Sequence, residues 1–157
     1  MKLRYKILNG IIGLLVVAVI SLGLVLSHTS SCEPPPAVAS GTPLMQAIIY
    51  RCYGSPEVLA LETVEKPVPA DKDVLVKVQA ASVNPLDWHY MRGSPYFMRL
   101  SSGIGAPDIE SFGADFAGTV EAVGSGVTRF KPGDRVFGGR TGAFGEYVVI
   151  GEDRALA

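Results

Sequence analysis

The sequence predicts a mainly β domain with short helices, preceded by one transmembrane helix. Residues 7–27 form a run of 21 residues without a charged side chain. From residue 45 onward the chain breaks into short segments rich in Val, Ile and aromatic residues, and Gly and Pro separate them. Many short strands at close spacing, with turn residues between them, predict an irregular β-barrel or sandwich.

The N-terminal apolar run is long enough to cross a bilayer. At about 1.5 Å per helical residue, residues 7–27 reach about 30 Å, the thickness of the hydrocarbon core. No basic residue follows the run until Arg51, whereas three precede it: Lys2, Arg4 and Lys6. The positive-inside rule therefore predicts a cytoplasmic N-terminus and a domain on the other side of the membrane. We expect residues 1–27 to be a single-pass anchor or an uncleaved signal.

Three other interpretations of this segment compete with the retained anchor. A cleaved signal peptide has a shorter apolar region and a small-x-small cleavage site, for which only a weak match exists at residues 27–29. A lipoprotein signal needs a Leu-type residue three positions before Cys32, where Thr29 stands. A buried helix of a globular protein is disfavoured, because the run is apolar on all sides and lies beside a basic end. The retained anchor is the favoured interpretation.

Residues 28–44 are predicted to be a linker. The segment holds four prolines among Ser, Thr and Ala, a composition typical of extended and poorly packed chain. It should lift the domain off the membrane as a spacer.

The only two cysteines are Cys32 and Cys52, so neither a disulfide framework nor a Cys-rich zinc site is expected. A Cys32–Cys52 bridge is conceivable in an oxidising compartment. The sequence disfavours it, because Cys32 lies in the flexible-looking linker.

Six strands and one helix are expected in residues 45–157. The helix is Pro85–Arg92, with Asn84 as its cap and Pro at its first position. The segment Lys131–Asp134 (KPGD) suits a type II turn, and Gly118 and Gly124 are expected to serve close packing or a positive φ. The strands are Gln46–Arg51, Val58–Val64, Val74–Ala81, Phe116–Val123, Arg135–Phe137 and Gly145–Ile150.

The charge pattern excludes one class of partner. Residues 45–157 carry eleven Lys and Arg against fourteen Asp and Glu, a net charge of −3 with the signs mixed. A nucleic-acid-binding surface needs a basic patch or stripe, so no nucleic-acid partner is expected.

Three motifs, in this order and spacing, resemble a known family. They are Ala80–Trp88 (AASVNPLDW), Gly113–Gly118 (GADFAG) and Lys131–Val136 (KPGDRV), and the opening residues 47–56 also fit. Together they resemble the N-terminal GroES-like domain of the medium-chain dehydrogenase/reductase superfamily, within it the quinone oxidoreductase-like branch. The resemblance covers residues 45–157. It implies a GroES-like irregular β-barrel and the substrate-side domain of an NAD(P)H-dependent oxidoreductase acting on a small molecule.

The resemblance also implies a substrate and cofactor cleft, formed by Asn84, Asp87, Trp88 and Asp115. The residue at the Asn84 position lies near the nicotinamide end of the cofactor in the family, although capping could be its whole role here. Asp115 is expected either to orient substrate or to accept a structural hydrogen bond at a turn. His89 is a weak candidate for a catalytic proton donor, since a lone surface His is more often inert.

No zinc is expected. Zinc-dependent members carry Cys where Asn84 stands and His where Ala114 stands, and catalytic zinc needs three protein ligands. The four cysteines of the structural zinc lobe are missing as well. Zinc-free relatives pass hydride from NADPH to a quinone or an electron-poor C=C bond, and the protein supplies binding, orientation and a proton donor.

A dinucleotide-binding loop should be a Gly-rich turn between a strand and a helix. None of the three Gly clusters, at residues 103–105, 124–126 and 138–142, has this context. We therefore expect the Rossmann domain to be absent from these residues, tight NADPH or NADH binding to be absent, and the chain to be a fragment that is inactive alone. A homodimer is expected only if that domain exists.

Two functions stay open at this point. One is the substrate-side domain of a membrane-anchored reductase, and the other is a non-catalytic GroES-like binding module on a membrane anchor. The expected topology also conflicts with the cofactor, because NADPH is a cytoplasmic reductant and the charge bias places the domain outside the cytoplasm.

Overall fold

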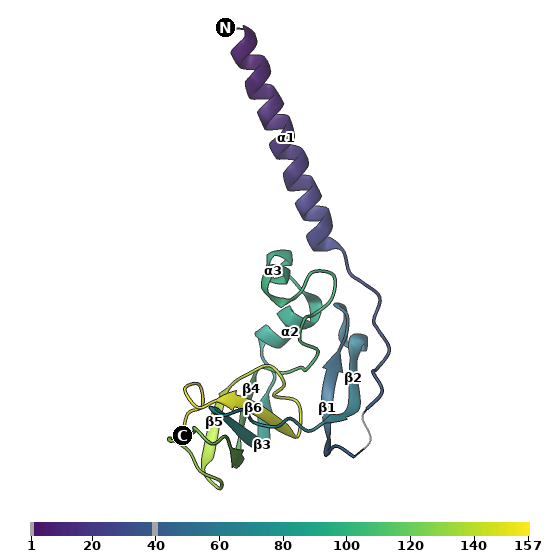
Figure 1. Cartoon of the computed structure of the whole chain (residues 1–157). Coiled ribbons are helices and arrows are strands. Elements are labelled where there is room, and N and C mark those ends of the chain that lie inside the picture. The colour runs from purple at the N-terminus through teal and green to yellow at the C-terminus, as the bar shows by residue number, and fades with distance from the viewer. Residues whose placement is uncertain (1, 39–40) are drawn as a thin grey trace.

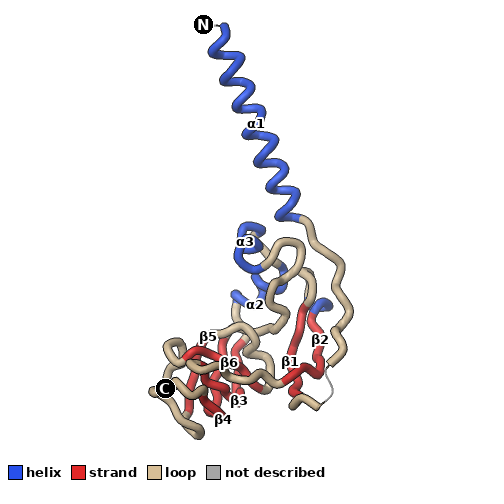
Figure 2. Tube along the Cα trace, viewed as in Figure 1, coloured by secondary structure: helices blue, strands red, loops and turns tan. Residues whose placement is uncertain are grey.

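The structure is a computed structural model that describes residues 2–38 and 41–157. Residue 1 of the expected anchor and residues 39–40 of the expected linker lie outside this description. One long helix, α1 (Lys2–Ser27), projects from a domain built of strands and short helices (Figure 1). Figure 2 shows that the strands gather at the end of the domain away from α1, while the short helices lie between the strands and α1.

Helix α1 confirms the helix expected over residues 7–27. Its described side chains are exposed on every face of the helix, and only Leu26, one residue before its end, is buried. Residues Arg4–Ser27 are long and apolar enough to cross a membrane, although signal sequences and core helices share this property. In this structure α1 is not a core helix, because the domain does not enclose it (Figure 1).

The strands form two separate antiparallel sheets. β1 (Leu44–Tyr50) and β2 (Leu59–Glu65) make a hairpin. The second sheet has the order β5-β4-β3-β6. Its strands are β3 (Asp73–Ser82), β4 (Asp115–Val123), β5 (Arg135–Gly139) and β6 (Tyr147–Gly151). All six predicted strands are confirmed, with ends that shift by a few residues.

The expected barrel is not closed. Among the described strands, β5 pairs with β4 and β6 pairs with β3, so both are edge strands of the larger sheet. Outside the strands, Phe137 of β5 also forms an isolated bridge with Leu156. The hairpin meets the rest of the domain through isolated bridges at Ala47–Gly145 and Ile49–Ser111, not through a continuous ladder. The sequence pattern predicted strands correctly, but closure depends on pairing between strands that are distant in sequence.

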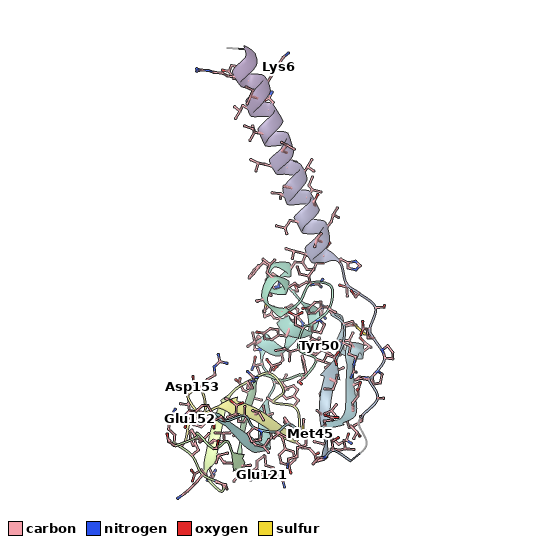
Figure 3. All side chains as sticks on the ribbon, viewed as in Figure 1. Lys6, Met45, Tyr50, Glu121, Glu152 and Asp153 are labelled. Carbon is pink, nitrogen blue, oxygen red and sulfur yellow. A yellow bond between two sulfur atoms is a disulfide. The ribbon has the colours of Figure 1, made fainter. Side chains whose placement is uncertain are left out.

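The main core lies on the larger sheet. Val74 and Val76 of β3 are fully buried, and they pack with Val120 of β4 and Ile150 of β6. A second, smaller cluster of Tyr50, Tyr53, Met91 and Phe112 joins the hairpin to the helical part of the domain. Figure 3 shows Tyr50 at the inner side of the hairpin, facing this part.

Helix α2 (Pro85–Arg92) has the predicted bounds and the predicted cap. The Asn84 side chain accepts a hydrogen bond from the Leu86 amide at 2.7 Å, and the Asp87 carboxylate accepts one from the Asn84 amide at 2.8 Å. Gly93 ends the helix with a left-handed φ of 55°. Three shorter helices were not predicted: η1 (Pro56–Val58), η2 (Tyr96–Met98) and α3 (Arg99–Ser102).

The segment after α1 is attached to the domain, which differs from the free spacer expected. The Ser30 amide donates to the Gly105 carbonyl at 2.8 Å. The Arg99 guanidinium donates to the carbonyls of Leu26 at 3.0 Å and His28 at 2.6 Å. The chain therefore turns back along the domain directly after the helix ends.

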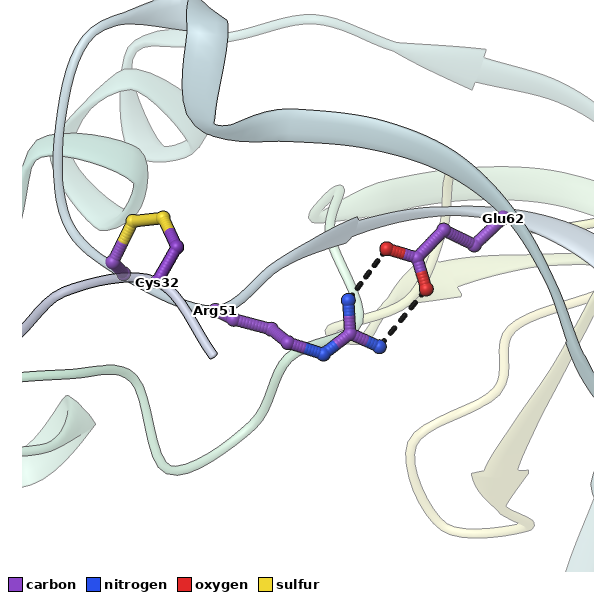
Figure 4. The surroundings of a disulfide bond; sticks show 4 residues. Cys32, Arg51 and Glu62 are labelled. Atoms are coloured by element: carbon purple, nitrogen blue, oxygen red, sulfur yellow. Dashed lines mark hydrogen bonds and ion pairs between the residues drawn. A yellow bond between two sulfur atoms is a disulfide. The ribbon is translucent and has the colours of Figure 1, made fainter. Parts of the chain in front are cut away.

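Cys32 and Cys52 form a disulfide, so the expectation of unpaired cysteines is wrong. Because the attachments at residues 26–30 direct the segment along the domain, the Cα atom of Cys32 comes within 4.7 Å of that of Cys52. Figure 4 shows the bridge beside the ion pair of Arg51 with Glu62. Two hydrogen bonds join these side chains, and the one from Arg51 Nη2 to Glu62 Oε2 measures 2.9 Å. The disulfide is a covalent attachment between the linker and Cys52, the second residue after β1.

Candidate functional site

A cleft of about 270 Å³ opens between α2, the loop that precedes β4 and the segment that follows β5. Its lining residues are Tyr50, Leu86, Asp87, Tyr90, Ser111, Phe112, Gly113, Ala114, Asp115, Gly139, Arg140, Thr141 and Arg154. The hydrogen bond from the Arg140 amide to the Ala114 carbonyl, at 2.7 Å, joins the two loops that form one wall. The cleft thus collects residues from five separated parts of the chain.

Two of the predicted site residues, Asp87 and Asp115, line this cleft, and a third, Asn84, is bonded to Asp115. The Asn84 side-chain amide donates to the Asp115 carboxylate at 2.7 Å, while its oxygen caps α2. Asp87 is 3% exposed, and its carboxylate accepts a hydrogen bond from the Asn84 backbone amide. Asn84 therefore has both a capping role and a contact at the site, because its two side-chain groups act on different partners.

Trp88 and His89 lie apart from this cleft. Trp88 lines a second depression, of about 400 Å³, together with Thr29, Tyr96 and Arg99. The His89 Nδ1 atom is 2.6 Å from the Ser94 carbonyl oxygen. Neither side chain lines the cleft that contains Asp87 and Asp115.

Most residues of the cleft were not singled out from the sequence, among them Tyr50, Tyr90, Arg140 and Arg154. A signal for Tyr90 was present, because it follows Asp87 by three residues on a predicted helix and so shares its face. Tyr50 ends β1 and is brought to the cleft by the packing of the hairpin against Phe112, with ring centroids 5.2 Å apart. Packing between distant segments of this kind has no signal in the local sequence.

Burial raises the pKa of the Tyr50 phenol, and the neighbouring Tyr53 and Tyr90 raise it further. The phenol of Tyr50 therefore stays protonated in the folded domain over the whole neutral range and can serve only as a neutral donor or acceptor.

The raised pKa of Tyr50 predicts an alkaline loss of stability. The unfolded chain ionises this phenol above about pH 10, whereas the folded domain does not. The contribution of the buried phenol to the free energy of unfolding is therefore fully present below about pH 10 and is lost as the pH rises above it. Urea unfolding at increasing alkaline pH should show a steeper loss in the unchanged chain than in Tyr50→Phe. Equal slopes would contradict the burial argument, and Tyr96→Phe, at a half-exposed position, is the matched control.

The residues at the expected zinc positions do not fit that metal. Ala114 has no donor atom, and both polar groups of the Asn84 side chain are already bonded to Leu86 and Asp115. Among residues 2–38 and 41–157, no three His, Cys, Asp or Glu side chains gather as a metal site.

The glycine clusters do not fit a dinucleotide either. Gly124 and Gly126 pack against the backbone and side chains of residues 70–72. Residues 138–142 run from β5 into a turn before β6, and α2 begins after Asn84 without a preceding glycine turn. Within the described parts of the chain, no strand passes through a Gly-rich turn into a helix.

The two open sheets, the capped helix α2 and the cleft beside it are features of a β domain that matches one known family. The alcohol dehydrogenase GroES-like domain matches residues 70–157. The chain belongs to this family, in the quinone oxidoreductase-like branch of the medium-chain dehydrogenase/reductase superfamily.

Three relatives illustrate this membership. The quinone oxidoreductase of Sus scrofa is 42% identical over 119 residues, which are 74% of this chain and 34% of the relative. The solved quinone oxidoreductase of Coxiella burnetii is 30% identical with a TM-score of 0.63, and the match covers 72% of this chain and 36% of that one. The solved enzyme of Pseudomonas syringae is 36% identical with a TM-score of 0.59, over 71% of this chain and 33% of that one. This chain thus spans about a third of the length of its relatives.

Proposed function

We propose that the chain supplies the substrate-side domain of a membrane-anchored, zinc-independent NAD(P)H-dependent reductase of quinones or activated C=C bonds. The observation that carries the proposal is the cleft beside α2, which Tyr90, Asp115 and Arg140 line. Asn84 donates a hydrogen bond to Asp115 there. The names of the relatives support the substrate class.

The cleft offers the groups that reduction of a quinone or enone requires. Negative charge develops on the substrate oxygen as hydride arrives, and donors aimed at that oxygen stabilise it. Tyr90 is a phenol donor in the cleft, and Arg140 and Arg154 bring positive charge to its rim. The nicotinamide cofactor would supply the hydride, and these residues bind and orient the substrate and hold a proton.

The cofactor does not fit the described residues, so the proposal places it in a further domain. The coding sequence downstream of Ala157 tests this. An in-frame continuation that encodes a strand, a Gly-rich turn and a helix would support the reductase. A stop codon directly after Ala157 would contradict it and favour the non-catalytic binding module. The chain alone is expected not to oxidise NADPH in the presence of a quinone.

Helix α1 is proposed as the membrane anchor, with the domain on the non-cytoplasmic side. Two independent features support this side: the basic residues precede α1, and a disulfide follows it. Disulfides persist in oxidising compartments and are rare in the cytosol.

The disulfide predicts the thiol reactivity of the protein in its native membrane. Alkylation with a maleimide mass tag should leave the unchanged chain untagged until a reductant is added, after which Cys32 and Cys52 both react. The Cys32→Ser variant is the matched control, because its Cys52 should react without reductant. Tagging of the unchanged chain before reduction would contradict the oxidised state and the side of the membrane inferred from it.

A further inference from the structure

Beside the end of α1 the domain presents a patch of exposed apolar side chains, formed by Tyr96, Phe97, Leu100 and Ile104. Their exposed fractions are 50%, 67%, 63% and 55%. They belong to η2, α3 and the loop that follows α3. Figure 1 shows α3 at the end of the domain nearest to α1, away from the strands.

The segment that forms this patch carries no exposed charge, and the exposed Arg92 lies beside it, lining the same depression as Tyr96. Between Gly93 and Pro107 the one charged residue is Arg99, and it is only 3% exposed. Its guanidinium is directed inward, where it bonds the Gly93 carbonyl at 2.8 Å and lies over the rings of Tyr53 and Tyr96. Contiguous apolar surface without charge marks a binding face for a protein or a membrane.

The position of the patch relative to α1 is fixed by several contacts. Arg99 binds the last carbonyls of the helix at Leu26 and His28, and Thr29 forms a bridge with Gly105. The disulfide at Cys32 closes the same segment onto the domain. The patch therefore cannot move far from the end of α1.

The length of α1 places this end at the bilayer surface. The uncharged run of residues 7–27 extends roughly 31 Å, close to the thickness of the hydrocarbon core of about 30 Å. With Lys6 at one boundary, Ser27 lies at the other. Side chains that contact residues 26–29 then lie at the depth of the lipid headgroups, where aromatic residues are enriched.

We infer that the segment Tyr96–Ile104 is a second membrane contact, which inserts its apolar side chains into the leaflet from which α1 emerges. The occupant of the patch is lipid, because the patch continues the surface of the anchor, is uncharged and has an aromatic border. The domain is thereby held in one orientation on the membrane. This inference rests on the membrane-spanning role proposed for α1.

Depth-dependent fluorescence quenching tests the inference on the full chain in phosphatidylcholine vesicles. In a Trp88→Phe background, Phe97→Trp places the single tryptophan in the patch. Phe137→Trp is the matched control, since Phe137 is also exposed and lies on β5, at the far end of the domain (Figure 1). Lipid brominated near the headgroup end of its acyl chains should lower the emission of the Phe97→Trp variant by about half, because interfacial side chains reach the acyl boundary. The emission of the Phe137→Trp variant should stay unchanged.

Flotation of the same vesicles separates the two proposals. If the Phe97→Trp variant floats but its emission is not quenched, the lipid contact of residues 96–104 is overturned. The membrane-spanning role proposed for α1 is then unaffected. Chain that does not float would overturn both. A cross-link between the 96–104 segments of two chains, without quenching, would assign the patch to a second copy and overturn the inference.

A second measurement needs no substitution in the domain. A phosphatidylcholine carrying a photoreactive diazirine in its acyl chain should label residues 96–104 of the unchanged chain and leave residues 135–139 unlabelled. Equal labelling of both segments, or labelling of α1 alone, would contradict the inference.

Discussion

Replacing Arg99 with alanine should lower the free energy of unfolding of the domain by about 3 kcal/mol, since truncating a buried charged side chain leaves its partners unsatisfied. The guanidinium bonds carbonyls of α1, of the linker and of the C-terminal end of α2, at Leu26, His28 and Gly93. Burial of those carbonyls without a donor accounts for most of the loss. Urea unfolding in mild detergent, followed by Trp88 fluorescence, measures it.

Arg135→Ala is the matched control, because Arg135 is exposed at the start of β5 and has no salt bridge within the described residues. Its replacement should change the stability by no more than about 0.5 kcal/mol. Equal effects at the two positions would contradict the role of Arg99 as the contact between α1 and the domain.

Gly124→Ala should destabilise the domain by about 2–4 kcal/mol, because overlap with backbone cannot be relieved by a side-chain rotation. An added Cβ atom would overlap the carbonyl oxygens of Ala70 and Asp71. The segment cannot simply shift, since the Gly124 amide is bonded to the Asp73 carbonyl at 2.9 Å and the Gly126 amide to the Asp71 carbonyl at 2.9 Å.

Gly139→Ala is the control for this substitution. Its Cβ would meet the Asp115 carboxylate at 3.5 Å, an ordinary contact, so the free energy of unfolding should change by no more than about 0.5 kcal/mol. A tolerated Gly124→Ala would show that residues 70–73 do not approach the turn as closely as described.

Local features of this chain were predictable from sequence because local chemistry determines them. Asn84 and Pro85 marked the start of α2, and Gly93 ends it. The turn at Lys131–Asp134 has its hydrogen bond at 3.2 Å and a φ of 96° at Gly133, as a type II turn requires. Close packing at Gly118 and Gly124 was predicted from their places at a strand and a turn.

Features that depend on distant segments were not predictable in the same way. The Cys32–Cys52 disulfide forms because Arg99 and Gly105 hold the linker, and nothing near Cys32 in the sequence indicates those partners. The open arrangement of the sheets depends on which strands pair across long loops. Of the cleft residues, Asp87 and Asp115 followed from motifs, whereas Tyr50 reaches the cleft only through the packing of the hairpin.

The proposed function requires that quinones bind in the cleft beside α2 and that the described residues hold no dinucleotide. Amide NMR spectra of the labelled chain in detergent micelles, recorded while 9,10-phenanthrenequinone and NADPH are added in separate titrations, test it most directly. The quinone should shift the amides of Tyr90, of residues 111–115 and of residues 139–141, and NADPH at the same concentration should shift none. Quinone shifts confined to other residues, or saturable shifts with micromolar NADPH, would contradict the claim.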